Sequence, residues 1–269
     1  MEWYWIVLIV CLSILFLIFI FSLFYKQFFK RVCDIICALA VFIFLWPLWI
    51  VLSILVRTKL GKPIIFKQVR PGKDGKLFTI YKFRTMSDKK DNNGILLPDE
   101  KRLTKFGKLL RKTSLDEMPE AINILKGDMS VVGPRPFLVK DNIFFDKKTN
   151  ERQKVKPGLT GLSQIKGRNN LSWEQKFKFD LEYIENISFF GDIAIVLKTI
   201  FKAFLKKENV NRNGFATDID YGDYLLSQDK ISNEVYEAKI IESKNLLSKY
   251  NHKKKHEIVK MEVVKDYEQ

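Results

Sequence analysis

Two long apolar segments open the chain, and after them the pattern of apolar and polar positions becomes mixed. Residues 3–25 carry no charged side chain and are long enough, as a helix, to cross the roughly 30 Å hydrocarbon core of a bilayer. The segment lacks the basic start and the small-residue cleavage site of a signal peptide, so it predicts a retained transmembrane anchor within 1–29. Cations follow it directly (Lys26, Lys30 and Arg31). By the positive-inside rule, this end is cytoplasmic and the N-terminus lies outside.

The second apolar segment, 32–56, has cations on both sides. They are Lys30 and Arg31 before it and Arg57, Lys59 and Lys62 after it. Because both flanks favour the cytoplasm, we expect a re-entrant membrane helix, broken at Pro47, that enters and leaves on one face. A kinked spanning helix is the alternative. Asp34, near the start of the segment, either complements the dipole of the helix or ties it to cationic residues elsewhere.

After Arg57, short alternating segments replace the apolar runs. Residues 62–70 and 77–84 predict two strands, and the Gly- and Pro-containing segment 71–76 between them predicts a turn, so we expect a β-hairpin. Helices are expected at 103–111, at about 116–125 and at 193–207. In the last of these, apolar residues occupy one face and lysines another, which is typical of an interfacial amphipathic helix; a helix packed on a core shows similar spacing.

The charge of the chain points to a polyanionic partner. The sequence has 46 Lys and Arg against 31 Asp and Glu, a formal net charge of +15, which suits nucleic acid, anionic lipid or a phosphorylated substrate. Its 47% hydrophobic residues exclude intrinsic disorder. All three cysteines lie in the apolar N-terminal third and both histidines near the C-terminus. Carboxylates are therefore the leading candidates for chemistry in the remaining domain.

Two adjacent carboxylates, Asp116 and Glu117, stand where a helix is expected to begin. One interpretation is structural, because Ser114 and Glu117 match a capping box and Pro119 suits a first helical turn. The other is chemical. Asp116 would be a nucleophile kept ionised by the helix N-terminus and by Arg111, and Glu117 would hold a metal ion.

Several motifs occur in a fixed order along residues 30–207. They are 30–34, Pro47, 68–72, 82–86, 114–119, 126–136, and 157–161 through 167–169. Together they closely resemble the bacterial sugar transferase family, the monotopic phosphoglycosyl transferases that start capsule, O-antigen, exopolysaccharide and glycoprotein glycans. Several motifs in order are more specific than any one of them.

The resemblance implies an α+β membrane protein in which a transmembrane helix (1–29) precedes a sugar transferase domain (30–207). That domain would contain the re-entrant helix 32–56 and a small cytoplasmic α/β catalytic domain with interfacial amphipathic helices. Residues 208–269 form an extension of unknown role. The implied location is the inner membrane, with the catalytic domain facing the cytoplasm and downstream glycosyltransferases as candidate partners. Nucleic acid is not an implied partner.

The resemblance also implies a two-step reaction. Asp116 attacks the sugar-bearing phosphate of a UDP-sugar, UMP leaves, and undecaprenyl phosphate then displaces the aspartyl phosphosugar. Asp116 and Glu117 would be the catalytic dyad, with Mg²⁺ near Glu117. The arginines implied to bind phosphate or to position the dyad are Arg111, Arg135 and Arg168.

Simpler interpretations stay open for these cations. Surface arginine is common, and Arg135, between two prolines, would then only pin a loop. Lys82 and Arg84 are weaker candidates for phosphate binding, because strand alternation places them on the same face as Ile80 and either has a structural interpretation. The competing functions are a membrane-anchored basic binding protein and a non-catalytic subunit of a polysaccharide assembly machine.

Overall fold

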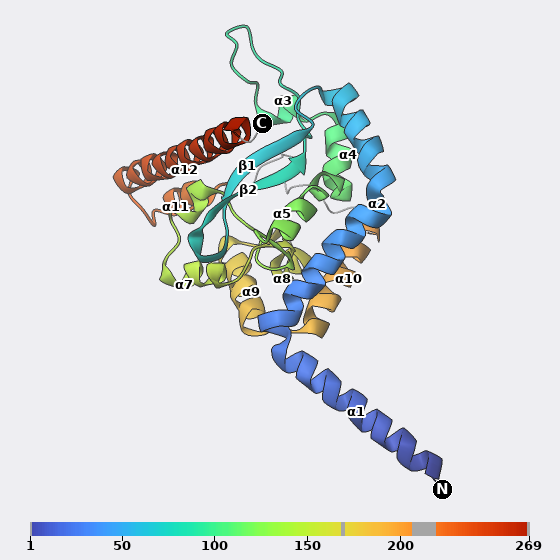
Figure 1. The fold of residues 1–269 in the computed structure, drawn as a ribbon. Helices are drawn as coiled ribbons and strands as arrows, with labels where there is room; N and C mark the ends of the chain where they lie inside the picture. Colours follow the sequence, from blue (N-terminus) through green and yellow to red (C-terminus); the bar gives the residue numbers. More distant parts are fainter. Residues whose placement is uncertain (1, 168–169, 206–218, 268–269) are drawn as a thin grey trace.

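The computed structural model describes residues 2–167, 170–205 and 219–267. Helix α1 (Glu2–Phe24) leaves the body as a free rod, and a π-helical turn (Tyr25–Phe29) joins it to α2 (Lys30–Leu60), which runs along one side of the remaining chain (Figure 1). The apolar helical segment from Trp3 to Leu60 is long enough to cross a membrane. The expected apolar N-terminal helix is therefore confirmed, with side chains that are exposed along nearly its whole length.

The expected break at Pro47 is wrong, because α2 continues through Pro47 as one helix. One face is buried against the body, through residues such as Ala38, Leu52 and Val56. The other face exposes large apolar side chains, among them Ile43, Phe44, Trp46 and Ile50. Pro47 removes one backbone donor, and the packing of α2 on the body holds the helix together around it. The re-entrant topology of this helix stays an expectation.

The start of α2 is fixed to the body by two side chains. Arg31 donates from Nη1 and Nη2 to the carbonyls of Ile124 and Leu125, at 2.7 and 3.1 Å. Asp34 Oδ1 accepts from Ser130 Oγ at 2.9 Å and from the backbone N–H of Val131 at 2.8 Å. Asp34 therefore ties the helix to the domain, but through a hydroxyl and a backbone amide where cations were expected.

The predicted hairpin is confirmed. Strands β1 (Ile65–Pro71) and β2 (Leu77–Phe83) pair antiparallel, with Phe66 opposite Lys82. The turn between them contains a short 3-10 segment, Lys73–Gly75, in which Asp74 and Gly75 adopt φ of 54° and 72°. Such left-handed backbone is tolerated best by Gly, Asn and Asp, which explains the composition of the turn.

Helix α5 (Glu120–Lys126) lies beside β2 where a third strand would pair. Asn123, which is fully buried, accepts from the Tyr81 N–H at 3.0 Å and donates to the Thr79 carbonyl at 2.7 Å. One side chain thus satisfies two backbone groups at the edge of the hairpin. Beneath them lies the core shared by α2, β2 and α5, which includes Ala38, Ile80, Ala121, Ile124 and Met129.

A second small sheet holds the segment that follows α5. Strands β3 (Ser130–Val132) and β4 (Gly158–Thr160) pair in parallel. Gly133 and Gly158 approach so closely that a Cβ on Gly158 would lie 2.1 Å from the Gly133 nitrogen. Only glycine permits this contact, which brings the chain after β3 against β4.

The remaining helices surround these sheets. They are α3 (Asp99–Arg102), α4 (Lys105–Thr113), α6 (Val139–Asn142), α7 (Lys147–Asn150), α8 (Leu162–Lys166), α9 (Trp173–Glu185), α10 (Phe189–Leu205), α11 (Tyr221–Ser227) and α12 (Asn233–Tyr267). In Figure 1, α12 and α2 lie on opposite sides of the hairpin. The helices expected at 103–111 and 193–207 correspond to α4 and α10. The one expected at about 116–125 begins only at Glu120.

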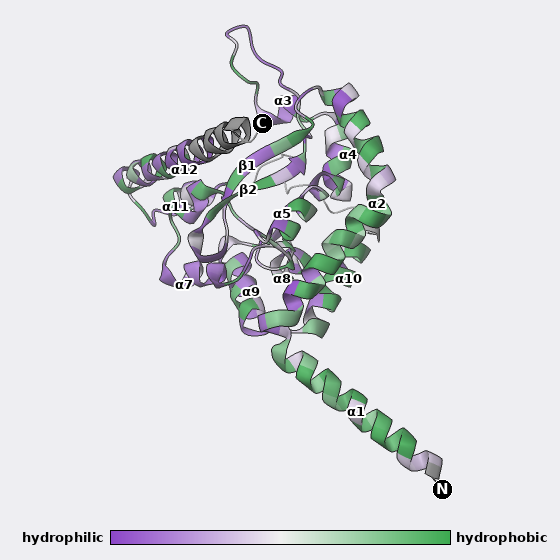
Figure 2. Ribbon diagram, in the orientation of Figure 1, coloured by the Kyte–Doolittle hydropathy of each residue, from purple (hydrophilic) through white to green (hydrophobic). Residues whose placement is uncertain are grey.

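Helix α10 has two apolar sides. Ile195 is buried in the body, whereas Phe190, Leu197 and Phe201 are 58–69% exposed. Figure 2 shows apolar residues predominating on α1, α2 and α10. The amphipathic pattern therefore serves both core packing and an exposed apolar surface, and the long apolar helix indicates membrane association.

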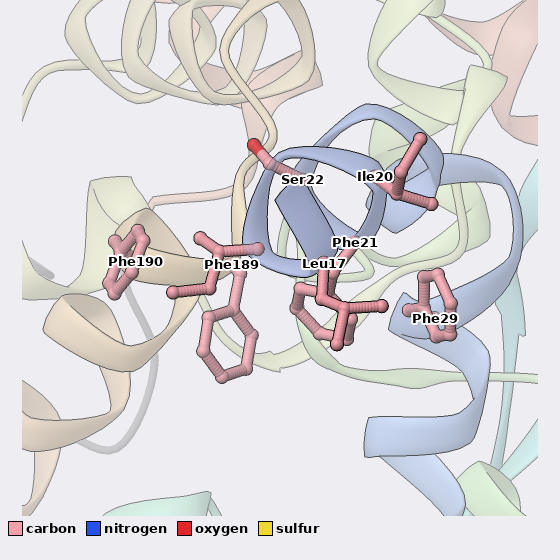
Figure 3. Close-up of a pocket in the computed structure, with 8 residues that line it drawn as sticks. Leu17, Ile20, Phe21, Ser22, Phe29, Phe189 and Phe190 are labelled. Atoms are coloured by element: carbon pink, nitrogen blue, oxygen red, sulfur yellow. The ribbon is translucent and has the colours of Figure 1, made fainter. Parts of the chain in front are cut away.

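Asp192 of α10 receives three donors where the anchor meets the body. Lys30 Nζ lies 2.5 Å from its carboxylate, and the hydroxyls of Tyr25 and Tyr183 donate to it at 2.7 and 2.9 Å. On the apolar side of this junction, Phe21, Phe29 and Phe189 line a cavity of about 430 Å³ between α1 and α10 (Figure 3).

Candidate active site

Asp116 and Glu117 lie on a single 3-10 turn, Leu115–Glu117, between α4 and α5. Ser114 ends α4 in the left-handed conformation, with φ 56° and ψ 18°, and its side chain caps no helix. Helix α5 begins only at Glu120. The capping-box interpretation is therefore wrong, because the backbone of Ser114 turns away from the geometry that a cap requires. The two carboxylates are left free for another role.

Glu117 is held by two cations. Its Oε1 lies 2.8 Å from Lys82 Nζ and 2.8 Å from Arg135 Nη2. Burial alone would raise the pKa of the Glu117 carboxyl, but the charges of Lys82 and Arg135 outweigh burial and hold this pKa well below its usual range. Glu117 is therefore ionised at neutral pH and forms the centre of the cluster.

Asp116 is buried, with 8% of its surface exposed, and makes no hydrogen bond or ion pair with any described residue. Burial raises the pKa of its carboxyl to about 6, and the charge of Glu117 acts in the same direction. Three cations oppose this rise (Lys82, Arg111 and Arg135). The result is a desolvated carboxylate that has no hydrogen-bond or ion-pair partner among the described residues and is ionised at neutral pH, the state in which a carboxylate can act as a nucleophile.

The loop that carries Arg135 is fixed through three consecutive carbonyls. Pro134 accepts from the Gly158 N–H at 3.0 Å. Arg135 accepts from Arg152 Nη2 at 2.5 Å, and Pro136 accepts from Arg70 Nη1 at 3.2 Å. Because every carbonyl of the segment has a donor, the guanidinium of Arg135 is presented to Glu117 from a rigid backbone.

Comparison with known proteins identifies the family of the chain. The bacterial sugar transferase family model matches residues 25–206. The chain belongs to the bacterial sugar transferase family. The resemblance inferred from the sequence motifs is thereby confirmed, and with it the prediction of a transferase enzyme.

Relatives of this sugar transferase differ in length. It is 52% identical over 162 residues to the uncharacterized sugar transferase EpsL of Bacillus subtilis, covering 60% of this chain and 80% of EpsL. It is 40% identical over 189 residues to the UDP-glucose:undecaprenyl-phosphate glucose-1-phosphate transferase of Klebsiella pneumoniae, covering 66% of this chain and 41% of that protein. It is 38% identical over 200 residues to the undecaprenyl-phosphate galactose phosphotransferase of Salmonella typhimurium, covering 68% and 42%. The chain thus spans about two fifths of the length of these two named transferases.

The structure brings most of the predicted site residues of the sugar transferase together. Arg111 donates from Nε to Thr85 Oγ1 at 3.0 Å, and its charge acts on Asp116. Arg84 instead donates to the carbonyls of Met86 and Lys62, so its guanidinium supports the chain after β2 and does not contact the dyad. Arg168 lies outside the described residues, and its predicted contact with phosphate stays a prediction.

Three functional neighbours were not predicted from the sequence. Glu120, 2% exposed, shares Lys82 with Glu117, since Lys82 Nζ lies 3.0 Å from Glu120 Oε1. Burial raises the pKa of the Glu120 carboxyl to about 7, despite the opposing charge of Lys82. Arg152 and Asp180 form an ion pair of 2.7 Å with side chains 3% and 1% exposed. The pair supports the loop that carries Arg135, because Arg152 also donates a hydrogen bond to the Arg135 carbonyl.

The carboxylates of the site fit a Mg²⁺ ion only in part. Within the described residues, no three His, Cys, Asp or Glu side chains are placed to hold a metal ion by themselves. Mg²⁺ in nucleotide sites, however, is bound by one or two carboxylates together with substrate phosphates and water. Asp116 and Glu117 offer those carboxylates, and one oxygen of Glu117 is already occupied by Lys82 and Arg135. The site therefore suits a metal ion that arrives with a diphosphate.

Proposed function

We propose that this sugar transferase moves a sugar-1-phosphate from a UDP-sugar to undecaprenyl phosphate and releases UMP. The observation that carries the proposal is the pair of neighbouring carboxylates in opposite environments: Asp116 is buried and raised in pKa, and Glu117 is held by two cations that lower its pKa. Pairs of acidic groups with separated pKa values mark sites where the two perform different tasks. The printed names of the Klebsiella and Salmonella relatives describe undecaprenyl-phosphate transferases, which supports the same reaction class here.

In the first step, a carboxylate oxygen of Asp116 attacks the sugar-bearing phosphorus. The bond from that phosphorus to the bridging oxygen of the diphosphate breaks, and UMP leaves with the electron pair. In the second step, an oxygen of undecaprenyl phosphate attacks the same phosphorus. The bond to Asp116 breaks, and the carboxylate is regenerated. Splitting the transfer into two displacements lets one site serve two large substrates in turn.

The surrounding residues neutralise and orient the diphosphate. Phosphoryl transfer needs little covalent help and depends on positioning and charge stabilisation. Arg111, Arg135 and Arg168 are proposed to contact phosphate oxygens, for which the planar guanidinium is well shaped. Lys82 keeps Glu117 ionised, and Glu117 would hold Mg²⁺, which when bound supplies further charge neutralisation.

The membrane arrangement follows from the exposed apolar helices. We propose that residues 1–29 span the inner membrane with the N-terminus outside, that α2 enters and leaves on the cytoplasmic face, and that residues 30–207 work there. The exposed apolar sides of α2 and α10 support this placement. The reaction would be the first membrane step of a capsule, O-antigen, exopolysaccharide or glycoprotein glycan, with downstream glycosyltransferases consuming its product.

The experiment that tests the reaction measures UMP release by the detergent-purified chain from a panel of UDP-sugars. Reactions are run with Mg²⁺ or with EDTA, and with or without undecaprenyl phosphate. We expect one or two donors to release UMP, sustained turnover only with the lipid phosphate, and loss of activity with EDTA. If no donor releases UMP, the result would favour the competing interpretations, a non-catalytic binding protein or assembly subunit.

The pH dependence of donor use is expected to show an acid limb near pH 6. Only ionised Asp116 is a nucleophile, so kcat/KM for the UDP-sugar should fall about tenfold per pH unit once the pH drops below the pKa of about 6. The limb should persist in Glu120→Gln, because Glu120 is not the nucleophile. A profile that stays flat down to pH 5 in the wild type would contradict the assignment of Asp116.

A further inference from the structure

The segment after the family match is fastened to the domain at the start of α11. Asp141, which is buried, accepts from the backbone N–H of Tyr221 at 2.9 Å and from that of Leu138 at 3.3 Å. Asp220 forms an ion pair with the neighbouring Lys140. The family model ends at residue 206, so α11 lies beyond it. The Asp141 carboxylate therefore joins the start of α11 to Leu138, the residue that directly follows Phe137.

The ring of Tyr221 completes an aromatic cluster. Its centroid lies 5.0 Å from Trp173, 5.2 Å from Phe177 and 5.5 Å from Phe145. Phe137 contacts the same three rings from the side of the catalytic loop, with its nearest centroid, that of Trp173, at 5.0 Å. Aromatic rings at these separations hold each other in definite orientations. Phe137 and Tyr221 thus pack on the same three rings.

Phe137 in turn supports Arg152. The guanidinium carbon of Arg152 lies 4.4 Å from the centre of the Phe137 ring, and Arg152 Nη2 donates to the Arg135 carbonyl at 2.5 Å. Arg135 then reaches Glu117 at 2.8 Å. Each step from α11 to the dyad is a direct packing contact, hydrogen bond or ion pair between described residues.

We propose that Tyr221 is a positioning residue, through which the C-terminal segment holds Arg135 against the catalytic dyad. The proposal rests on the proposed function, since it concerns the same carboxylates. The extension then acts as part of the active-site support. The physical reason is that displacing a catalytic group by about 1 Å lowers the reaction rate by on the order of a hundredfold, even when the altered residue is distant.

The test compares Tyr221→Ala with Tyr221→Phe in the full chain. The alanine variant removes the ring, and we expect kcat to fall by on the order of tenfold or more. Tyr221→Phe keeps the ring contacts and should keep the wild-type kcat. Ile241→Ala, on the more exposed part of the same extension, is the matched control and should behave as wild type.

A second measurement is independent of activity. Hydrogen exchange in the peptide covering residues 132–138 should accelerate in Tyr221→Ala, whereas the peptide covering 65–83 should not change. If the alanine variant does not fold, Tyr221→Leu, which keeps apolar volume without the aromatic edge, takes its place. Unchanged exchange at 132–138, or an unchanged kcat in the folded alanine variant, would overturn the proposal. If the wild type releases no UMP but exchange at 132–138 is faster in Tyr221→Ala, the proposed reaction is wrong. The structural link between Tyr221 and the Arg135 loop is then still supported.

Discussion

Asp116→Asn is expected to abolish UMP release, with kcat lower by roughly 10³-fold or more, as found when a covalent nucleophile is removed. The amide keeps the size of the side chain but cannot form the bond to phosphorus. The measurement is a single-turnover assay with a radiolabelled UDP-sugar, which also reports whether label becomes attached to protein. Wild type should carry label when the lipid phosphate is omitted, and the variant should not. Label bound by Asp116→Asn would place the nucleophile elsewhere.

The same substitution should not weaken the fold. The pKa of Asp116 is raised to about 6 in the folded protein, so ionising this carboxyl destabilises the folded state as the pH rises from 4 through 6. At pH 7.5 a neutral amide removes that penalty, which is at most about 3 kcal/mol for a shift of this size. We expect a Tm equal to or above that of wild type at pH 7.5, with the difference shrinking towards pH 4. A large drop in Tm would mean that lost activity reflects unfolding.

Arg135→Ala is expected to lower kcat/KM by about 10²-fold, the size of effect seen when a charge-stabilising donor is lost. The variant leaves Glu117 with Lys82 alone and removes a guanidinium proposed to meet phosphate. Arg135→Lys should recover part of the loss, because it restores charge without the planar fork. Arg102→Ala is the matched control, since the Arg102 side chain bonds, among the described residues, to Ser87 and Asp99 and not to the carboxylates of the site. Equal losses in Arg102→Ala and Arg135→Ala would remove the case for a specific role.

Features encoded by short-range pattern were predictable from the sequence. The hairpin is one, since alternation on both sides of a Gly- and Pro-rich turn is a local signal. The position of Asp116 and Glu117 beside a cation is another, because Arg111 precedes them by one helical turn or so in the sequence. The capping interpretation was wrong because residue spacing alone does not determine the path of the backbone. Ser114 and Glu117 have the right spacing for a cap, but the chain must reverse direction between α4 and α5, and Ser114 makes that turn in the left-handed region.

Contacts between distant residues were not predictable in this way. Arg152 and Asp180 are 28 residues apart, and Asn123 lies more than 40 residues from the backbone groups that it bonds. A faint signal was present for Asp180. It lies on the stripe of α9 that also carries Trp173, Phe177 and Tyr183, and a carboxylate on a buried stripe requires a partner. The sequence alone did not indicate which cation would supply it.

The junction at Asp192 bears on the order in which the protein is made. Tyr25 follows α1 directly and Lys30 begins α2, whereas Asp192 follows Lys30 by 162 residues. At synthesis rates of about 5–20 residues per second, the ribosome needs roughly 10–30 seconds to cover that interval. Tyr25 and Lys30 are therefore synthesised long before their partner exists. The contact with Asp192 forms only after the intervening residues have been made, so the domain is completed against a helical segment that is already present.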